Sequence, residues 1–447
     1  MKSKLKLTLI AFALIFVTGG CSPITVDSGN LMRPPKATGD EEKIIELIEE
    51  NSGDNYKLKY PENGSVRSAI AMYDLDGDSQ NEAIAFYETS DPADTTTHML
   101  VMYENSDGWN LAGDAQTQNT NIDRVEFADV TGDKILDIII GYKTFNSNVN
   151  QLNVYSYSKG TATPIDISQT YTSFVINDFN EDLKNDILTL SINTEKNSEA
   201  VLLSYNESDK IISPISGTEI DNNITSFENI ISGKTNENQT AAFIDGTIGT
   251  DKICTQLIYY DSQKNSLENG LYSNSYDYIN PTIRDGKTFC TDIDKNEIIE
   301  IPTLTKMPHT SEENEEYIAT KAIWNTFDTT SKSLNEVSTM VVNYNSAYYF
   351  KLSDNLKYIT TAQINTQDNS MTIYEWDGDK INNQLLTIKV YNSDEWSTTG
   401  KTDGYFLIKE DTSNAYCCKI YENEGSYKFT DTEIQTSFSL FSEYTEN

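Results

Sequence analysis

The stretch Tyr73-Asp74-Leu75-Asp76-Gly77-Asp78, which leads through Glu82 into the apolar run Ala83-Ile84-Ala85-Phe86, sets the pattern for most of this sequence. The pattern returns at residues 129–137, 178–186 and 292–300, each time directly before an apolar run. A worn copy without the acids occupies residues 232–240. We number these segments loops 1 to 5 in chain order, so loop 4 is the worn copy. The intervals between their first residues are 55, 49, 54 and 60 residues, which indicates an internal structural repeat.

Each repeat is predicted to form four short strands, because alternating or continuous apolar runs are bounded by Asn, Asp, Ser and Gly turns. In the first two repeats the predicted strands are Arg67–Met72, Ala83–Tyr87, Met99–Tyr103, Trp109–Ala112, Arg124–Ala128, Ile138–Tyr142, Leu152–Tyr157 and Ala162–Ile167. Four-stranded units that recur about every 40–50 residues are typical of β-propeller blades. The sequence therefore predicts a mainly β protein with a five-bladed propeller at residues 63–345. Six or seven blades are the alternative if strands nearer the C-terminus also belong to it.

The acidic loops have the spacing D-x-[DN]-x-[DN]-x-x-x-[DE], in which alternate side chains of a tight loop can converge. Ca²⁺ is held by six to eight oxygen ligands at about 2.3–2.6 Å. An EF-hand would need Glu at position twelve, where this chain has Ala85, Ile140, Thr189 and Thr303. We therefore predict structural calcium sites of another kind, with solvated hairpin turns as the alternative. The predicted ligands are Asp74, Asp76, Asp78, Glu82, Asp129, Thr131, Asp133, Asp137, Asp178, Asn180, Asp182, Asp186, Asp292, Asp294, Asn296 and Glu300.

A calcium loop between the first two strands of a blade resembles the FG-GAP or VCBS repeat of integrin-type propellers. The family pattern is D-x-N-G-D-G-x-x-D. This chain keeps Gly at position four in loops 1 and 2, but position six, where Gly is usual, is occupied by Ser79, Lys134, Leu183 and Glu297. Loop geometry, and with it calcium affinity, is therefore where the chain departs from the family.

The segments 31–36, 58–61 and 67–69 also resemble the start of uncharacterised VCBS-repeat lipoproteins from Gram-positive gut bacteria. Their sequences here are Leu-Met-Arg-Pro-Pro-Lys, Leu-Lys-Tyr-Pro and Arg-Ser-Ala. This resemblance implies a lipoprotein that carries a propeller, and it implies no activity.

The N-terminus has the features of an export signal. Lys2, Lys4 and Lys6 precede the apolar run Leu7–Val17, and Thr18-Gly19-Gly20-Cys21 resembles the lipobox of bacterial lipoproteins. We predict a signal peptide at residues 1–20, lipidation of Cys21, a tether at 21–40, and a short capping helix with lead-in at 41–62. Two acyl chains are enough for stable anchoring, so the mature chain is expected on the outer face of the cell membrane. The alternatives are an ordinary signal peptide or a short membrane anchor.

The composition limits the possible partners. The formal charge of -36 disfavours nucleic acid and anionic headgroups, because like charges repel, and suits the binding of hard cations. The 27 Tyr and 16 Phe favour strands over disorder. Cys254 and Cys290 either pair or stay as free buried thiols, and Cys417 and Cys418 are interpreted as packing residues.

Beyond about residue 345 the repeat period breaks. Longer alternating strands are predicted at Ala347–Leu352, Met371–Trp376, Leu385–Val390, Tyr405–Ile408 and Ala415–Tyr421. A helix is predicted at Asp431–Phe441, with Thr430 or Asp431 as its N-cap. Residues 346–447 are therefore predicted to form a small α+β domain.

Catalytic motifs are not visible in the sequence. His98 and His309 have no Ser or Cys nucleophile motif beside them, and no residue is predicted to be catalytic. The leading hypothesis is a non-catalytic binding or scaffold module for an extracellular protein or glycan. The alternative is an extracellular, polysaccharide-directed hydrolase with carboxylates in the propeller funnel, and a third possibility is a purely structural envelope protein.

Overall fold

The computed structural model describes residues 39–444 except 54, 92, 119–120, 145–148, 194–196, 237–238, 276, 399–402 and 425. The predicted signal peptide, the lipidation site Cys21 and nearly all of the predicted tether lie outside the described residues. Within the described part of the chain, no helix combines the length and the apolar character needed to cross a membrane.

Six antiparallel sheets follow one another along the described part of the chain, and we number them in order. Sheet 1 contains β1 (Tyr56–Leu58), β2 (Ile70–Tyr73), β3 (Glu82–Thr89), β4 (Thr97–Asn105) and β5 (Gly108–Thr117). Sheet 2 contains β6 (Asn121–Ala128), β7 (Asp137–Lys143), β8 (Asn150–Ser158), β9 (Thr161–Ile165) and β10 (Thr170–Tyr171). Sheet 3 contains β11 (Ser173–Asn177), β12 (Asp186–Ser191), β13 (Glu199–Asn206) and β14 (Ile211–Glu219).

The remaining sheets are built in the same way. Sheet 4 contains β15 (Ile224–Lys234), β16 (Thr240–Ile248), β17 (Lys252–Asp261), β18 (Ser266–Asn269) and β19 (Arg284–Asp285). Sheet 5 contains β20 (Ile301–Lys306), β21 (Thr320–Asp328), β22 (Ser333–Asn343), β23 (Tyr348–Leu352) and β29 (Phe438–Leu440). Sheet 6 contains β24 (Thr360–Asn365), β25 (Ser370–Trp376), β26 (Ile381–Asn392), β27 (Phe406–Glu410) and β28 (Asn414–Ile420). The helices are α3 (Asp40–Ser52), α4 (Ser393–Thr398), α5 (Asp431–Ser437) and the 3₁₀ turn η2 (Phe441–Glu443).

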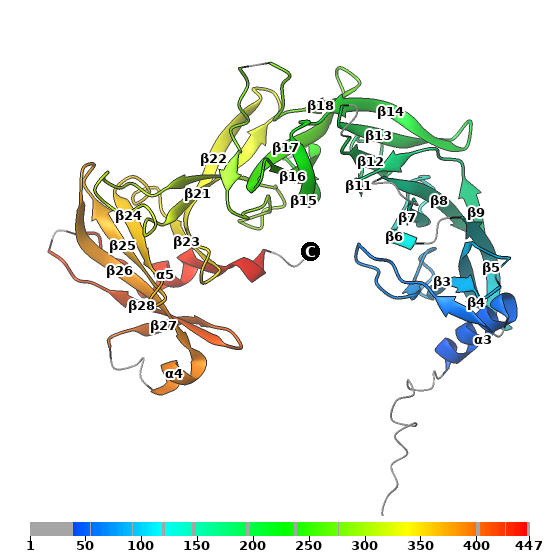
Figure 1. The fold of residues 1–447 in the computed structure, drawn as a ribbon, viewed down its shortest axis with the longest axis horizontal. Helices are drawn as coiled ribbons and strands as arrows, with labels where there is room; N and C mark the ends of the chain where they lie inside the picture. The colour runs from blue at the N-terminus through cyan, green and yellow to red at the C-terminus, as the bar shows by residue number, and fades with distance from the viewer. Residues whose placement is uncertain are drawn as a thin grey trace, which may run out of the picture.

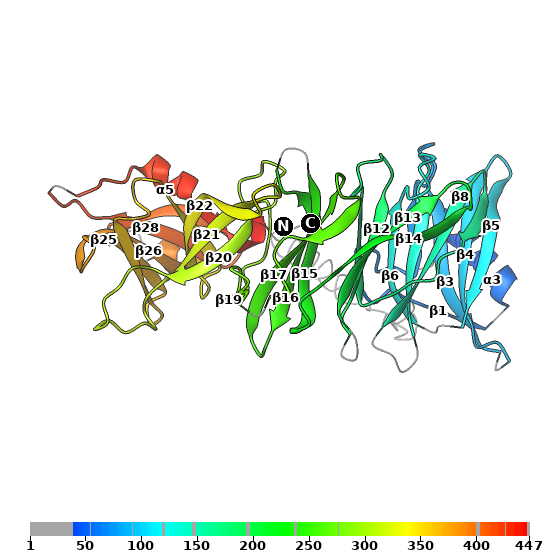
Figure 2. The same ribbon diagram turned by 90° about the horizontal axis from the view of Figure 1, so that it is seen from above.

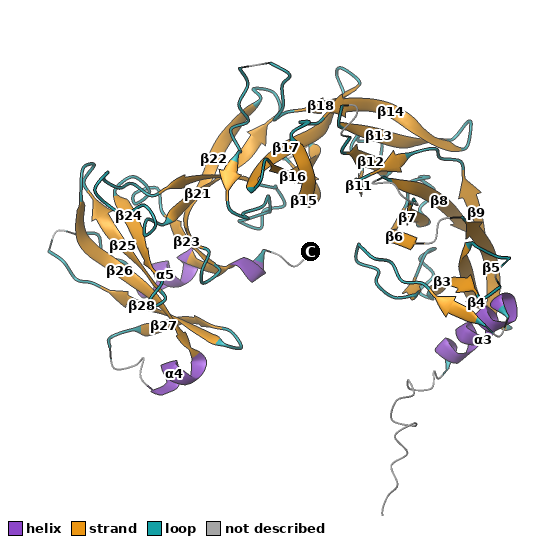
Figure 3. Ribbon diagram, viewed as in Figure 1, coloured by secondary structure: helices purple, strands orange, loops and turns teal. Residues whose placement is uncertain are grey.

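The sheets are arranged as propeller-type blades in an open arc, with sheets 1 and 6 at its two ends (Figure 1). The view turned by 90° shows them side by side along the long axis (Figure 2). Strands dominate, and of the few helices α3 and α4 lie at the two ends of the arc (Figure 3). The prediction of a mainly β protein made of propeller-type blades is confirmed.

The core lies between neighbouring sheets. Ile138 and Ile140 face sheet 1, whereas Ile139 between them faces sheet 3. Side chains of a strand alternate between its two faces, so a continuous apolar run is what a sheet covered on both sides requires. Each fully buried Ile contributes roughly 1.5–3 kcal/mol relative to exposure. The apolar runs that follow the acidic loops therefore hold the stack of sheets together.

Short helices cover the outward faces of the two end sheets. Ile44 and Ile48 of α3 are buried against Ala85 and Tyr87 on the outer face of sheet 1. Trp396 of α4 packs against the outer face of sheet 6. End caps of this kind are what a stack of repeats needs, because a terminal unit has no neighbour on one side.

Strand pairing continues across the predicted domain boundary at 345/346, because β23 pairs with β22. Residues of the predicted C-terminal domain thus complete sheet 5 and form sheet 6. The predicted helix at Asp431–Phe441 is shorter in the structure: α5 ends at Ser437, because Phe438 is extended and pairs with Phe350. Thr430 is the N-cap, and it forms a capping box with Glu433.

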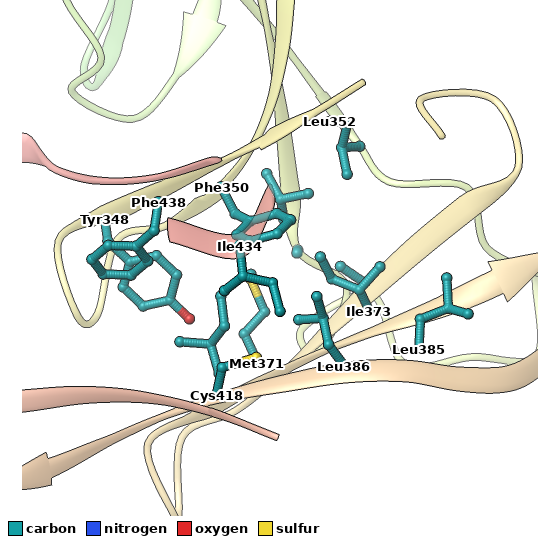
Figure 4. Close-up of a cluster of buried hydrophobic side chains, with 14 of the residues drawn as sticks. Tyr348, Phe350, Leu352, Met371, Ile373, Leu385, Leu386, Cys418, Ile434 and Phe438 are labelled. Carbon is teal, nitrogen blue, oxygen red and sulfur yellow. The ribbon is translucent and has the colours of Figure 1, made fainter. Parts of the chain in front are cut away.

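Sheets 5 and 6 share the largest apolar core, which Figure 4 shows. Ile434 of α5 lies between Phe350 of sheet 5 and Met371 and Leu386 of sheet 6, and Phe438 of β29 belongs to the same core. All five side chains are less than a tenth exposed. The C-terminal segment therefore fastens the last sheet to the rest of the arc.

Candidate metal centres

Loop 1 joins β2 to β3, loop 2 joins β6 to β7, and loop 3 joins β11 to β12. Loop 5 precedes β20 in the same way, but there the first strand is reduced to a single bridge between Thr291 and Glu300. The acidic loops that repeat in the sequence therefore occupy equivalent positions in successive sheets.

The four acidic loops share one backbone path. The Asp at position one accepts a hydrogen bond from the backbone N–H at position six. The four N···O distances are 3.0 Å for Asp74–Ser79, 2.8 Å for Asp129–Lys134, 3.0 Å for Asp178–Leu183 and 2.8 Å for Asp292–Glu297. The side chain at position five accepts from the N–H at position seven, at 2.7–3.0 Å in every loop. The pattern of acids in the sequence therefore produces one recurring turn.

Position nine carries a buried acid in each loop. Glu82, Asp137, Asp186 and Glu300 are 4%, 1%, 0% and 0% exposed. Each accepts the backbone N–H of position two, at 2.8, 2.9, 3.2 and 2.9 Å respectively. These bonds close the loop and aim the carboxylate at its inside.

Burial raises the pKa of all four acids. The pKa is about 6 for Asp137, about 6 for Asp186 and about 7 for Glu300, although backbone N–H bonds lower each of them. For Glu82 the direction is the same, again with burial as the largest cause. Buried carboxylates without a positive partner are costly, so a cation in the loop would relieve this cost.

Loops 1 and 5 each bring three carboxylates together. Oxygens of Asp74, Asp76 and Asp78 lie within 4.8 Å of one another, and so do those of Asp292, Asp294 and Glu300. Asp76 Oδ1 and Glu300 Oε1 are buried and have no hydrogen-bond partner. Because buried polar atoms are normally paired, these two oxygens have room for a further ligand.

In loops 2 and 3 position three is Thr131 or Asn180 instead of an acid. Thr131 Oγ1 lies 3.5 Å from Asp137 Oδ1, and Asn180 Nδ2 lies 3.3 Å from Asp186 Oδ1. The side chains at positions three and nine thus approach each other in these loops as well. The side-chain atoms that could coordinate a metal ion in the four loops are oxygens, apart from the amide nitrogen of each Asn. Oxygens are the ligands that hard cations prefer.

Position six adopts the left-handed conformation in spite of its side chain. Ser79, Lys134, Leu183 and Glu297 have φ values of 71°, 72°, 70° and 69°. The departure from Gly seen in the sequence therefore leaves the backbone path unchanged and stores strain in it, since a residue with a Cβ loses roughly 1–2 kcal/mol there.

Leu183→Gly is expected to stabilise the protein by about 0.5–1 kcal/mol. Leu183 is 92% exposed, so the substitution removes little packing while it relieves the left-handed strain. The larger freedom of Gly in the unfolded chain offsets part of the gain. The urea midpoint measures the change, and Leu183→Ala is the control, because Ala keeps the Cβ and should show no gain. Equal midpoints for the Gly and Ala variants would contradict the strain.

The loops are also joined from sheet to sheet. Leu136 N–H in loop 2 donates to Leu75 O in loop 1 at 2.8 Å, and Asn185 N–H in loop 3 donates to Asp129 O in loop 2 at 3.1 Å. Tyr157 of sheet 2 donates its hydroxyl to Glu82 Oε1 at 3.2 Å. Sequence reasoning missed Tyr157, because it lies 75 residues from Glu82 and no local pattern marks it.

Sheet 4, whose strands β15 and β16 are joined through the worn loop 4, contains a buried ion pair instead. Asp245 Oδ1 and Arg284 Nη2 are 2.7 Å apart, and both side chains are 0% exposed. The backbone N–H of Cys290 also donates to Asp245, at 2.7 Å. Cys254 and Cys290 are free buried thiols, which decides between the two alternatives left open by the sequence. Burial, together with the charge of Asp245, raises the pKa of the Cys290 thiol well above its usual value.

The histidines have structural partners. His98 is 6% exposed, and its ring nitrogens lie 2.8 Å from Asp94 Oδ2 and 3.3 Å from Asp114 Oδ1. His309 Nδ1 lies 2.9 Å from the carbonyl oxygen of Met307. A Ser-His-Asp arrangement needs a hydroxyl that donates to one ring nitrogen. The Thr96 hydroxyl lies 3.2 Å from His98 Nε2, but it donates to Asp94 Oδ1 at 2.6 Å, and acids contact both ring nitrogens.

A cavity of about 470 Å³ on the inner side of the arc is where the hydrolase alternative would place its carboxylates. It is lined by residues of β6, β11 and β15, which lie on the inside of the arc in Figure 1. Asp123 accepts hydrogen bonds from Asn63 and Tyr171. The hydroxyls of Ser226 and Thr247 lower the pKa of Glu228, whereas a general acid needs a raised pKa.

The comparisons with known proteins identify no family. No protein-family model matches the chain, and no curated protein matches it. Among solved structures, a Lactobacillus plantarum protein is 8% identical with a TM-score of 0.28, covering 72% of this chain and 84% of that one. Saccharomyces cerevisiae Sqt1 is 9% identical with a TM-score of 0.33, covering 75% and 78%. An exo-beta-1,3-galactanase from Phanerochaete chrysosporium is 9% identical with a TM-score of 0.27, covering 76% and 80%. Likeness at this level carries no functional argument, so function rests on the geometry described above.

Proposed function

We propose that this protein is an exported, lipid-anchored, non-catalytic binding module whose blades are stiffened by calcium in loops 1, 2, 3 and 5. The lipid anchor is Cys21, and the loops belong to the FG-GAP or VCBS type. The ligand is an extracellular protein or glycan, which binds to the rigid arc of sheets at the cell surface.

The side chains at positions one, three, five and nine of each loop would hold the ion. Calcium would supply the positive charge that the buried position-nine acids lack. The observation that carries the proposal is Glu300, which is 0% exposed and has an oxygen, Oε1, without a hydrogen-bond partner, beside Asp292 and Asp294. A solvated turn gives no reason to bury a carboxylate in this way.

The inter-sheet hydrogen bonds give this binding a structural consequence. Loop 2 donates to loop 1 and loop 3 donates to loop 2 through their backbones. An ion that rigidifies one loop therefore also stiffens the contact with the neighbouring sheet. A stiff frame suits recognition, because it presents surface groups in one arrangement.

Calcium binding to residues 22–447 by isothermal titration calorimetry tests the proposal. We expect up to four ions per chain, with affinities of about 10⁻⁴–10⁻³ M. Asp292→Ala should remove one of them. The control is Asp377→Ala, because Asp377 forms an exposed Asp-Gly-Asp turn without a buried ninth acid. No calcium heat, or equal stoichiometry in both variants, would refute the proposal.

The hydrolase alternative has no comparable support. In the inner cavity Asp123 and Glu228 are already engaged by neighbouring side chains. No specific observation favours catalysis over binding, so the binding module is our conclusion.

A further inference from the structure

The outer face of sheet 6 is only partly covered. Helix α4 places Trp396 over Tyr391 of β26 and Cys417 of β28. The remaining part of this face borders a cavity of about 620 Å³, within the range usual for ligand sites. The cavity is separate from the metal loops and from the inner side of the arc.

The floor of this cavity is a row of uncharged polar side chains across three strands. Gln363 of β24 is paired with Thr372 of β25, and Thr372 with Thr387 of β26. The hydroxyl oxygens of Thr372 and Thr387 are 2.8 Å apart. Because residues paired in this way project from the same face of a sheet, the row offers amide and hydroxyl groups along one line.

Tyrosines surround this row. Tyr374, Tyr405 and Tyr421 line the cavity and are partly exposed, and Tyr317, which is 47% exposed, lies on its rim. The Lys419 ammonium lies 5.8 Å from the Tyr405 ring centroid and 5.7 Å from that of Tyr421. The ammonium group therefore forms cation–π contacts with both rings. Tyr side chains provide flat contact area together with a polar hydroxyl, at a low cost in conformational entropy.

The carboxylates that line the cavity disfavour an anionic ligand. The ionisable side chains of Glu313, Glu316 and Asp368 line it, and among its described lining residues there is no Lys or Arg. The whole chain carries a formal charge of -36. An anionic ligand would be repelled, whereas a neutral ligand rich in hydroxyl groups could exchange hydrogen bonds with amides, hydroxyls and carboxylates alike.

We propose that this cavity binds a neutral carbohydrate chain, with sugar rings against the tyrosines and sugar hydroxyls on the Gln363–Thr372–Thr387 row. The proposal rests on the binding function proposed above and assigns that function to sheet 6. The uncharged groups of the floor favour a glycan over a cationic peptide, which would need the carboxylates at the centre of the site instead of at its edge.

The test is affinity electrophoresis of residues 22–447 in gels that contain dextran, starch, xylan, mannan or β-glucan, with polygalacturonate as an anionic probe. Binding to oligolysine by titration calorimetry provides the cationic arm. We expect retardation by at least one neutral polysaccharide and none by polygalacturonate. Tyr374→Ala and Gln363→Ala should each lower the association constant at least tenfold, whereas Tyr358→Ala, which removes a tyrosine that is 71% exposed outside the cavity, should leave it unchanged.

Unchanged thermal midpoints show that the variants fold, and Tyr317→Ala provides a second probe at the exposed rim if Tyr374→Ala does not fold. Retardation by none of the neutral polysaccharides would overturn the proposal, and so would binding that the cavity variants leave intact. Oligolysine binding alone would replace it with a cationic peptide site. Calcium binding in the same preparations is measured separately, so a failed glycan test leaves the calcium-stiffened module standing, and the reverse also holds.

Discussion

Chelating calcium with EDTA is expected to lower the thermal midpoint of residues 22–447 by about 7 °C relative to 1 mM CaCl₂. A site with a Kd of about 10⁻⁴ M adds RT ln(1 + [L]/Kd), or about 1.4 kcal/mol, at this concentration. Four such sites add about 6 kcal/mol. The entropy of unfolding, about 2.1 cal/mol/K per residue for a unit of about 400 residues, converts this to about 7 °C. Differential scanning calorimetry measures the shift.

Variants assign the effect to individual loops. Asp74→Ala, Asp129→Ala and Asp292→Ala should each remove about a quarter of the calcium-dependent shift, while Asp377→Ala should retain all of it. Identical midpoints in EDTA and calcium would mean that the acidic loops are only turns.

The pH dependence of the same midpoint should reverse sign with calcium. The pKa values of Asp137, Asp186 and Glu300 are raised in the folded chain, to about 6, 6 and 7. Folded protein without calcium therefore holds protons that the unfolded chain releases, and the stability these groups provide at low pH is lost as pH rises through 6–7. In EDTA the thermal midpoint should therefore fall between pH 5 and pH 7.5, because the stability that the three protonated acids contribute is lost. In calcium it should rise, because the ion competes with protons for the same oxygens.

The sequence was sufficient for the features that depend on local spacing. Continuous runs such as Ile138-Ile139-Ile140 predicted strands, and the repeated spacing of the acids predicted a loop at the same place in each repeat. Position six showed the limit of this reasoning. A Leu or Lys does not reveal a left-handed backbone, because neighbouring hydrogen bonds, such as that between Leu183 N–H and Asp178, impose it.

Features that depend on contacts between distant segments could not be predicted. Tyr157 meets Glu82 only after two sheets have packed, and Arg284 meets Asp245 only after β19 has paired with β17. The shorter α5 has a similar cause: Phe438 pairs with Phe350, and this tertiary contact overrides the local helix propensity.

Arg284→Met is expected to destabilise the protein by about 3–5 kcal/mol, because it leaves the Asp245 carboxylate buried without its positive partner. The pair is fully buried, and Arg284 also donates hydrogen bonds to the carbonyl oxygens of Thr282 and Thr288, at 2.9 and 2.8 Å. Loss of the side chain would therefore also leave two buried carbonyl groups short of donors. The urea midpoint of residues 22–447, measured in calcium, reports the change.

The Lys252–Asp285 pair is a matched control, because it joins the same strands β17 and β19 at the surface. Its N···O distance is 3.6 Å, and its side chains are 53% and 83% exposed. Lys252→Met should shift the midpoint by no more than about 0.5 kcal/mol, since exposed ion pairs contribute little. If both variants behaved alike, the buried pair would have no special role in sheet 4.

The double variant Asp245→Leu with Arg284→Met separates charge from hydrogen bonding. Removing both charges should recover part of the loss, because an apolar pair no longer carries an unpaired buried carboxylate. Recovery should be incomplete, since the backbone N–H of Cys290 loses its acceptor, at a cost of about 1–3 kcal/mol. Full recovery would mean that charge neutrality alone matters in sheet 4. Partial recovery would mean that the hydrogen bonds of the pair also stabilise sheet 4, both the bond from Cys290 to Asp245 and those from Arg284 to the carbonyl oxygens of Thr282 and Thr288.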